Sequence, residues 1–365
     1  MHRRIFIFVT TDCNLRCRYC YEHNKRAGTA NVEKIKVALV KEFGLVEYKS
    51  IQLSFLGGEP FIEFNKIKDI SEWVWANFPD RQIGIDVSTN GTILTDDIRK
   101  WLKDNESRFT VSISIDGRKS DHNKLRGDSF DLIDLPFFTS LKRVKAKMTI
   151  SPNSISRMME NYLYVKSLGF DTSLSLAQEV EWNNEQLNIY QQELLKFIDY
   201  QLENPDIDLL PFFRYNIQKF APRRHGVSRW NCGAGYYEIA YDINGNFYPC
   251  HAYVSQFKEY DQELITSLMD RIENSSFNEC MIECKDCVYK HVCVPCLGMN
   301  QVHRGAIHRV NPISCEIQKT EINATVKLYA VALSERQKYV WLSGKSNEEL
   351  LDIINGIKYI ASHEL

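Results

Sequence analysis

The sequence predicts an α/β fold built on a parallel sheet, followed by a smaller cysteine-rich part. Two observations carry this prediction. Short apolar runs rich in β-branched residues alternate with longer amphipathic stretches from residue 4 to about residue 204. Three of the eleven cysteines lie between positions 13 and 20, and the other eight lie between positions 232 and 315. The cysteine positions alone therefore divide the chain into two differently organised parts.

The composition narrows the class of protein. With 365 residues, 44% of them hydrophobic, the chain is long enough for one large α/β domain and a smaller one. Its net charge of −2 gives no support for binding to nucleic acid or to an anionic membrane. The apolar run Ile5–Val9 is too short for a signal peptide or a membrane span. We therefore expect a soluble, cytoplasmic protein whose cysteines bind metal instead of forming disulfides.

Six strand–helix repeats are expected in the first part. The strands are Ile5–Val9, Ile51–Phe55, Ile83–Val87, Thr110–Ile115, Lys145–Ile150 and Thr172–Leu176. The helices are Val32–Phe43, Asn65–Trp75, Asp96–Lys103, Phe130–Arg143, Ser154–Leu168 and Glu185–Leu202. Strict alternation implies a parallel sheet, either open and doubly wound or curved into a partial barrel. In both cases the site is expected at the carboxyl ends of the strands.

The rest of the chain has less regular periodicity. Asn244-Gly245 is a strong turn signal, and it predicts a hairpin between Glu238–Asp242 and Phe247–Tyr248. Residues 318–342 and 346–362 have amphipathic helical patterns. The expected domains are residues 1–204 (the α/β domain), 205–230 (a bridge), 231–318 (the cysteine-rich domain) and 319–365 (terminal helices).

Polar and glycine-rich signatures follow the first four predicted strands. A cysteine loop follows the first strand, and Gly57-Gly58-Glu59-Pro60 follows the second. Ser88-Thr89-Asn90-Gly91 ends the third, and Asp116-Gly117 follows the fourth. Each motif alone is an ordinary turn signal. Because the carboxyl ends of parallel strands share one edge, together they predict a single site.

Cys13, Cys17 and Cys20 place three thiols on one compact loop. A [4Fe–4S] cluster has four irons to ligate, so three cysteines leave one iron open. An open iron suits a cluster that activates a substrate. A zinc knuckle or a group of buried thiols is the alternative interpretation.

The spacing of these cysteines, with the aromatic residue Tyr19 before the third, resembles the signature of the radical S-adenosylmethionine (SAM) superfamily. The resemblance implies a partial (β/α)6 barrel over residues 1–204 and a cluster, held by Cys13, Cys17 and Cys20, whose open iron binds SAM. It also implies SAM contacts from Tyr19, Gly57, Gly58, Glu59, Ser88, Asn90, Ser114, Asp116 and Arg126. For Arg126, a solvated surface arginine is the alternative.

The family's chemistry comes from its cofactors. The resemblance implies that an electron from a donor such as flavodoxin or ferredoxin cleaves SAM to a 5′-deoxyadenosyl radical. That radical then abstracts a hydrogen atom from the substrate.

The later cysteines resemble the SPASM extension of this superfamily, which holds two auxiliary [4Fe–4S] clusters. The resemblance implies one cluster on Cys284, Cys287, Cys293 and Cys315, and another on Cys232, Cys250 and Cys296. Cys280 is left over, and three interpretations stay open: Cys280 completes the second set, an iron of that cluster stays open to bind substrate, or Cys280 donates a hydrogen atom. A zinc ribbon is the alternative for the spacing from Cys284 to Cys296.

SPASM-bearing enzymes mostly modify peptides or proteins, so the resemblance implies such a substrate. We expect a maturase of a ribosomally made peptide, forming a crosslink or an altered side chain. Because the chain starts directly on its first strand, leader-peptide recognition is expected from a separate protein or from the barrel surface. Anaerobic sulfatase maturases carry an Asp where this chain has His251. We expect His251 and Cys280 near the auxiliary cluster that adjoins the substrate cavity. The alternatives are a sulfatase maturase and a non-catalytic iron–sulfur or zinc scaffold.

Overall fold

The computed structural model describes residues 1–22, 28–221, 232–256, 260–274 and 281–364. These residues form two compact units. The first unit comprises Met1–Ser151, Glu160–Val180 and Gly233–Glu273, and the second comprises Pro152–Met159, Glu181–Cys232 and Asn274–Leu365.

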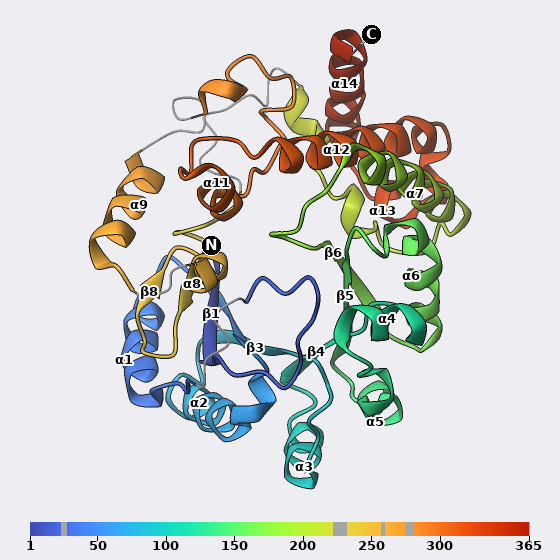
Figure 1. Ribbon diagram of the computed structural model, residues 1–365. Coiled ribbons are helices and arrows are strands. Elements are labelled where there is room, and N and C mark those ends of the chain that lie inside the picture. The colour runs from blue at the N-terminus through green and yellow to red at the C-terminus, as the bar shows by residue number, and fades with distance from the viewer. Residues whose placement is uncertain (23–27, 222–231, 257–259, 275–280, 365) are drawn as a thin grey trace. The chain divides into compact units, whose positions relative to one another are not determined.

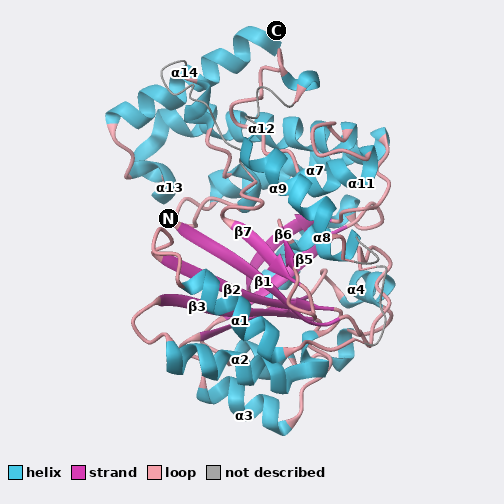
Figure 2. Cartoon of the chain, turned by 90° about the vertical axis from the view of Figure 1, so that its left-hand side faces the viewer, coloured by secondary structure: helices cyan, strands magenta, loops and turns pink. Residues whose placement is uncertain are grey.

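The first unit is built on an eight-stranded sheet (Figures 1 and 2). Its strands are β1 (His2–Thr10), β2 (Ser50–Gly57), β3 (Gln82–Thr89), β4 (Phe109–Ser114), β5 (Val144–Ile150), β6 (Asp171–Leu176), β7 (Glu238–Tyr241) and β8 (Phe247–Tyr248). Their order is β6-β5-β4-β3-β2-β1-β7-β8, and every neighbouring pair is parallel except β7 and β8. Among the described residues β6 and β8 do not pair, so the sheet is an open, partial barrel. The predicted α/β class and the predicted hairpin are both confirmed.

The helices of this unit follow the strands as expected. They are α1 (Val32–Phe43), η1 (Pro60–Glu63), α2 (Phe64–Asn77), α3 (Asp96–Asp104), α4 (Lys119–Arg126), η2 (Phe130–Leu132), α5 (Leu135–Thr139), α8 (His251–Gln256) and α9 (Gln262–Asn274), with most of α6 (Met158–Ser167). Asn31 begins α1 by accepting a hydrogen bond from the Lys34 backbone N–H. Figure 2 shows α1, α2 and α3 along one face of the sheet.

The prediction of one helix over residues 130–143 is wrong. The structure has the short turn η2 and the five-residue helix α5 there. Pro136 lies in the first turn of α5, where its missing N–H costs nothing, and the Asp134 side chain caps that turn. The amphipathic pattern therefore continues through a segment in which Pro136 prevents one continuous helix. Helix α4, which ends at the left-handed Gly127 (φ 66°), was not predicted because most of its residues are polar.

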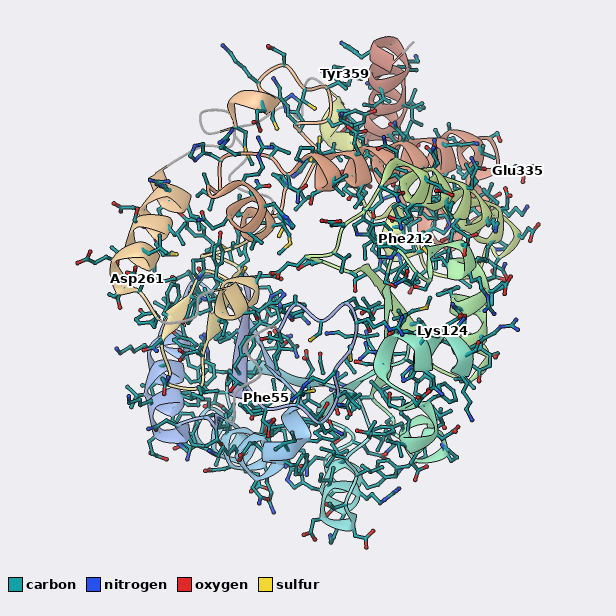
Figure 3. The ribbon with its side chains drawn as sticks, viewed as in Figure 1. Phe55, Lys124, Phe212, Asp261, Glu335 and Tyr359 are labelled. Carbon is teal, nitrogen blue, oxygen red and sulfur yellow. The ribbon has the colours of Figure 1, made fainter. Side chains whose placement is uncertain are left out.

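The two faces of the sheet differ in chemistry. Side chains such as Ile5, Leu53 and Phe55 are fully buried in the apolar core (Figure 3 labels Phe55). Because successive side chains alternate, the other face carries the intervening residues. On β4, β5 and β6 these are all polar: Thr110, Ser112, Ser114, Lys145, Lys147, Thr149, Asp171, Ser173 and Ser175. Strands β4, β5 and β6 are therefore apolar on one face only, and the expectation of apolar strands is wrong for these three. It holds for β1, in which Ile5–Val9 are all apolar and buried.

The second unit is helical. Its elements are η3 (Ile155–Arg157), α7 (Asn184–Glu203), η4 (Pro211–Phe213), η5 (Ile217–Phe220), η7 (Ile282–Cys284), α11 (Leu297–Arg304), α12 (Pro312–Ala332), η8 (Leu333–Lys338), α13 (Val340–Ser343) and α14 (Asn347–Glu364). An apolar core that includes Phe220, Ile322, Leu342 and Ile353 holds them together, and Cys287 and Cys293 pack against it. The cysteine-rich segment is thus stabilised by packing against the apolar core of the terminal helices. None of the described helices of the chain is long and apolar enough to cross a membrane.

Gly356 provides a test of how the second unit packs. It lies inside α14, where a Cβ atom would stand 2.3 Å from the backbone oxygen of Ile217. Helix propensity favours alanine over glycine by about 1 kcal/mol, whereas overpacking costs about 1–3 kcal/mol. We expect Gly356→Ala to lower the thermal midpoint followed by circular dichroism. Gly344→Ala is the control, since its Cβ would meet no described heavy atom within 4 Å. A raised midpoint for Gly356→Ala would contradict the close packing of α14 on η5.

Candidate active site

A cavity of about 420 Å³ lies within the first unit, at the carboxyl ends of β1 to β6. The sequence signatures meet there. Among its lining residues are Cys13, Cys17, Tyr19, Cys20, Gly57, Gly58, Glu59, Ser88, Asn90, Ser114, Arg126 and His251. Of the predicted contacts within this unit, Asp116 and Cys250 are not among the lining residues. In Figure 1 the strands curve around the dark-blue loop that follows β1 and carries the three cysteines.

The cysteine loop directs N–H donors at two of its sulfurs. The backbone N–H of Leu15 points at Cys13 Sγ (3.4 Å), and the Arg126 guanidinium lies 3.9 Å from Cys17 Sγ. Donors of this kind, one of them cationic, stabilise a thiolate over a thiol. The described residues hold no group of three Cys, His, Asp or Glu placed for one metal ion; the three thiols instead surround a cavity. This donor set fits a cluster with one open iron.

Gly57 and Gly58 allow the turn after β2 to lie against the cysteine loop. A Cβ atom on Gly58 would stand 2.0 Å from the backbone oxygen of Asp12 and 2.9 Å from the Cβ of Cys13. The Gly58 N–H donates to Thr10 O (3.0 Å), and the Glu59 N–H donates to Asp12 O (2.7 Å). Only a residue without a side chain permits this approach. The glycines therefore position the thiols as well as exposing backbone toward the cavity.

Glu59 is buried, and protein donors hold its carboxylate in place. One oxygen accepts from the Phe61 N–H (3.0 Å) and from Thr89 Oγ1 (2.6 Å), and the other accepts from the Asn90 N–H (2.7 Å). Burial raises the pKa of Glu59, although these hydrogen bonds act in the opposite direction. A carboxylate offers about four acceptor positions, so one remains for a ligand cation at the cavity wall.

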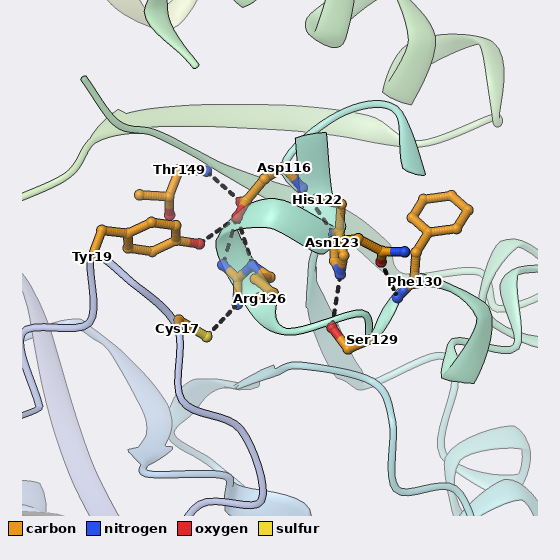
Figure 4. A network of polar contacts seen from close by, with 9 residues as sticks. All are labelled: Cys17, Tyr19, Asp116, His122, Asn123, Arg126, Ser129, Phe130 and Thr149. Atoms are coloured by element: carbon orange, nitrogen blue, oxygen red, sulfur yellow. Dashed lines mark hydrogen bonds and ion pairs between the residues drawn. The ribbon is translucent and has the colours of Figure 1, made fainter. Parts of the chain in front are cut away.

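Asp116, which is fully buried, organises the opposite side of the cavity (Figure 4). Its Oδ2 accepts from Arg126 Nε (2.7 Å) and from the Tyr19 hydroxyl, and its Oδ1 accepts from the Thr149 N–H (2.9 Å). Burial raises the pKa of Tyr19, which keeps the phenol as a donor. Burial alone lowers the pKa of Arg126, but Asp116, with smaller contributions from Tyr19 and Cys17, outweighs this effect and keeps the guanidinium charged. Arg126 is buried, so its alternative interpretation as a solvated surface arginine is wrong.

His122 fixes the backbone of Asp116. Its Nδ1 accepts from the Asp116 N–H (3.3 Å), and its Nε2 lies 3.0 Å from Ser129 Oγ. Burial lowers the pKa of His122 to about 4, so the imidazole is neutral near pH 7 and accepts this hydrogen bond. Sequence patterns gave no sign of this contact, because it depends on how α4 packs after β4.

Lys147 is the main functional candidate that sequence analysis missed. It lines the cavity from β5, level with Ser114 on β4 and Ser173 on β6, and donates to Ser88 Oγ (2.7 Å). Although its side chain is open to the cavity, the surrounding protein lowers the pKa of Lys147, and the nearby Arg4 charge adds to this effect. The alternation of Lys145, Lys147 and Thr149 with apolar residues was the available signal.

His251 begins α8 and lines the same cavity, against the Phe6 ring (4.5 Å between centroids). Its buried Nδ1 has no hydrogen-bond partner among the described residues. Burial, reinforced by the charges of Lys147 and Arg4, lowers the pKa of His251 to about 4. A neutral imidazole with one unused nitrogen therefore faces the cavity.

A second group of thiols lies within the second unit. Cys284, Cys287, Cys293 and Cys315 line one small pocket, together with Lys319. Burial and the neighbouring thiols raise the pKa of Cys284 to about 11, and burial raises the pKa of Cys293 further. Four thiols that line one pocket are costly to ionise unless a cation joins them, and iron deprotonates its thiol ligands. The set fits the auxiliary cluster that the sequence predicts.

The remaining predicted ligands are distributed over the chain. Cys250 is buried in the first unit just before α8, whereas Cys232 and Cys296 belong to the second unit, so their grouping stays a prediction. Cys280 lies outside the described residues. The ten described cysteines are not joined by disulfides.

The fold and the cavity define a cofactor-binding enzyme of the partial-barrel class. Comparison with known proteins gives the family. Residues 7–177 match the model of the Radical SAM superfamily. A protein of Methanocaldococcus jannaschii is 33% identical over 115 residues, which are 32% of this chain and 39% of that protein. A cysteine-type anaerobic sulfatase-maturating enzyme of Clostridium perfringens is 22% identical over 96% of this chain and 97% of its own. The subtilosin biosynthesis protein AlbA of Bacillus subtilis is 24% identical over 68% of this chain and 55% of its own.

Solved structures share the fold. A structure titled anSMEcpe, with bound AdoMet and a peptide, has a TM-score of 0.70 at 19% identity, over 92% of this chain and 100% of that chain. SuiB of Streptococcus suis, bound to its precursor peptide SuiA, has a TM-score of 0.58 at 16% identity, over 86% and 75%. Residues 7–177 of the chain therefore form a Radical SAM domain, and this enzyme domain implies SAM and one [4Fe–4S] cluster as cofactors.

Asp116→Asn tests the buried ion pair. The amide leaves the Arg126 guanidinium buried without a counter-charge, so we expect unfolding in urea to show a loss of about 3–5 kcal/mol. Asp131→Asn is the matched control, since the pair of Asp131 with Lys119 is more than half exposed on both sides and such pairs contribute about 0–1 kcal/mol. Equal losses for the two variants would contradict the central role of Asp116.

Proposed function

We propose that the chain binds SAM and a [4Fe–4S] cluster in the 420 Å³ cavity and uses them to modify a peptide. The observation that carries the proposal is that Cys13, Cys17 and Cys20 share this cavity with the Gly57–Glu59 turn and with Ser88 and Asn90. When bound, the cluster supplies the electron that cleaves SAM to a 5′-deoxyadenosyl radical. The auxiliary cysteines are proposed to hold two further [4Fe–4S] clusters.

The residues of the chain have distinct parts in this proposal. The remaining acceptor position of Glu59 receives the SAM ammonium, because a buried carboxylate is the strongest acceptor for a cation at that wall. Tyr19 flanks the adenine, and its phenol is held by Asp116. Lys147 and the hydroxyl groups of β4 to β6 form the polar wall against which ribose and substrate lie. A fixed wall matters because the reacting C–H bond must be held close to the radical.

The first test is metal content and SAM cleavage. We expect anaerobically reconstituted protein to hold about twelve irons, in three four-iron clusters, and to release 5′-deoxyadenosine from SAM with dithionite. Replacing Cys13, Cys17 and Cys20 by Ala should remove about four irons and abolish 5′-deoxyadenosine. Replacing Cys284, Cys287, Cys293 and Cys315 by Ala is the matched control, which should also lose about four irons but keep SAM binding. Iron-replete wild type that never forms 5′-deoxyadenosine would favour the scaffold alternative.

The proposed substrate is a ribosomally made peptide that receives a crosslink or an altered side chain. Support comes from the likeness to AlbA, a bacteriocin biosynthesis protein, and to SuiB, whose structure contains a precursor peptide. The cavity is lined by apolar side chains such as Leu174 and Leu176 as well as by hydroxyl groups and Lys147, which suits a peptide segment with both apolar and polar groups. A separate leader-binding protein and a flavodoxin or ferredoxin are the proposed partners.

Formylglycine formation is the second candidate function. It is favoured by the likeness to the Clostridium perfringens sulfatase-maturating enzyme over nearly the whole chain, and His251 faces the cavity where such enzymes carry an Asp. A histidine whose pKa is about 4 is no weaker a base than an ordinary aspartate. His251 therefore does not exclude this activity by itself.

Peptides containing Ser or Cys distinguish the two candidates. On the maturase proposal, we expect wild type to leave them unmodified and His251→Asp to form formylglycine only in traces, as measured by mass spectrometry. His251→Asn controls for loss of the imidazole without a new base. Formylglycine made efficiently by wild type would overturn the maturase proposal in favour of sulfatase maturation.

A further inference from the structure

A basic hollow of about 760 Å³ lies on the surface of the first unit, apart from the cavity described above. The charged side chains that line it are four cations and a single carboxylate: Arg16, Arg18, Lys119, Lys124 and Asp128. The whole chain has a net charge of −2. The hollow is therefore a local concentration of positive charge on a chain whose overall charge is slightly negative.

The positive charge of this basic hollow is mostly not neutralised. Lys119 pairs with Asp131, but both side chains are more than half exposed. Arg16 donates to the backbone oxygens of Cys13 (2.6 Å) and Leu15 (3.0 Å), which are neutral. Within the described part of the chain, no salt bridge involves Arg16, Arg18 or Lys124. Exposed cations whose charge is not neutralised by a salt bridge are available to an approaching anionic surface.

The basic hollow lies directly behind the cysteine loop. Cys17 lines the cavity, while its two sequence neighbours, Arg16 and Arg18, line the hollow. The loop is thus a single layer between the two. Helix α4 has the same arrangement: Arg126 faces the cavity beside Cys17 Sγ, and Lys124, labelled in Figure 3, faces the hollow. A hydrogen bond from the Arg18 N–H to Leu125 O (2.9 Å) joins loop and helix.

We propose that the basic hollow is the docking surface for an acidic electron-carrier protein. This inference rests on the proposed function, because the carrier supplies the electron that the proposed cleavage of SAM consumes. The carrier is oxidised by one electron, and SAM takes up that electron as its C5′–S bond breaks to give methionine and the 5′-deoxyadenosyl radical. Complementary charge raises the association rate and orients the carrier, and the single-layer loop keeps the path to the thiols short.

The surface is tested by binding. Flavodoxin, an acidic electron carrier, is titrated against the reconstituted enzyme by biolayer interferometry at low and high salt. We expect Lys124→Glu and Arg18→Glu each to weaken binding about tenfold at low salt, and by less at high salt, because salt screens exposed charges. Lys68→Glu is the matched control: Lys68 is an exposed lysine on α2, away from the hollow, and its reversal should leave the affinity unchanged.

A second readout separates docking from damage to the cysteine loop. Lys124→Glu should lower the rate of 5′-deoxyadenosine release severalfold with reduced flavodoxin and leave the rate with dithionite unchanged, since dithionite needs no docking surface. The proposal is overturned if both charge-reversal variants bind flavodoxin as tightly as wild type. It is also overturned if Lys124→Glu lowers the rate with dithionite as much as the rate with reduced flavodoxin. If wild type makes no 5′-deoxyadenosine with either reductant, the proposed function fails, and the affinities still decide whether the hollow binds the carrier.

Discussion

The carboxylate of Asp116 is the interaction on which the geometry of the cavity depends. It stands just beyond the end of β4 and accepts hydrogen bonds from the cysteine loop, from α4 and from the backbone of β5. A buried charge is tolerated only when it is paired and its acceptor positions are filled. Here Tyr19, Arg126 and Thr149 fill them, so the same bonds that stabilise the carboxylate also fix where these three segments meet. The position of Cys17, beside Arg126, follows from this arrangement.

The other side of the cysteine loop is fixed by close backbone packing and not by charge. Gly58 lies against Asp12 and Cys13 at a distance that excludes any side chain, and the turn then places Glu59 under the end of β3. The loop is held between a charged network and a glycine contact, both supported by regular strands. Reactive thiols on a loop need such support, because misplacement by about 1 Å is enough to impair a site.

Local patterns in the sequence sufficed for features that depend on neighbouring residues. The six parallel strands, the bounds of α1 and the hairpin at Asn244-Gly245 follow from periodicity and turn chemistry. The contacts of Asp116 with Tyr19 and Thr149 join residues far apart in the chain, and no local pattern encodes them. The contacts of His122 are close in sequence, but they depend on how α4 packs after β4. The prediction of a helix over residues 130–143 was wrong because it relied on the apolar spacing and gave too little weight to Pro136, which interrupts a helix. Lys147 was missed although its alternation was visible, because the strand was taken as buried on both faces.

Alternation also explains how one thin loop serves two chemistries. Around Cys17 the cysteine side chain faces the cavity, and the arginines beside it face the outer surface. The inner face presents thiols to a cavity that is also lined by the buried Glu59 and by hydroxyl groups, which suit a cofactor and a substrate that must be kept from water. The outer face presents exposed cations, whose attraction acts over several ångströms through solvent and favours rapid, reversible encounters. Neighbouring residues of one loop line the two faces, so on our proposal a reductant approaches the outer face without entering the cavity.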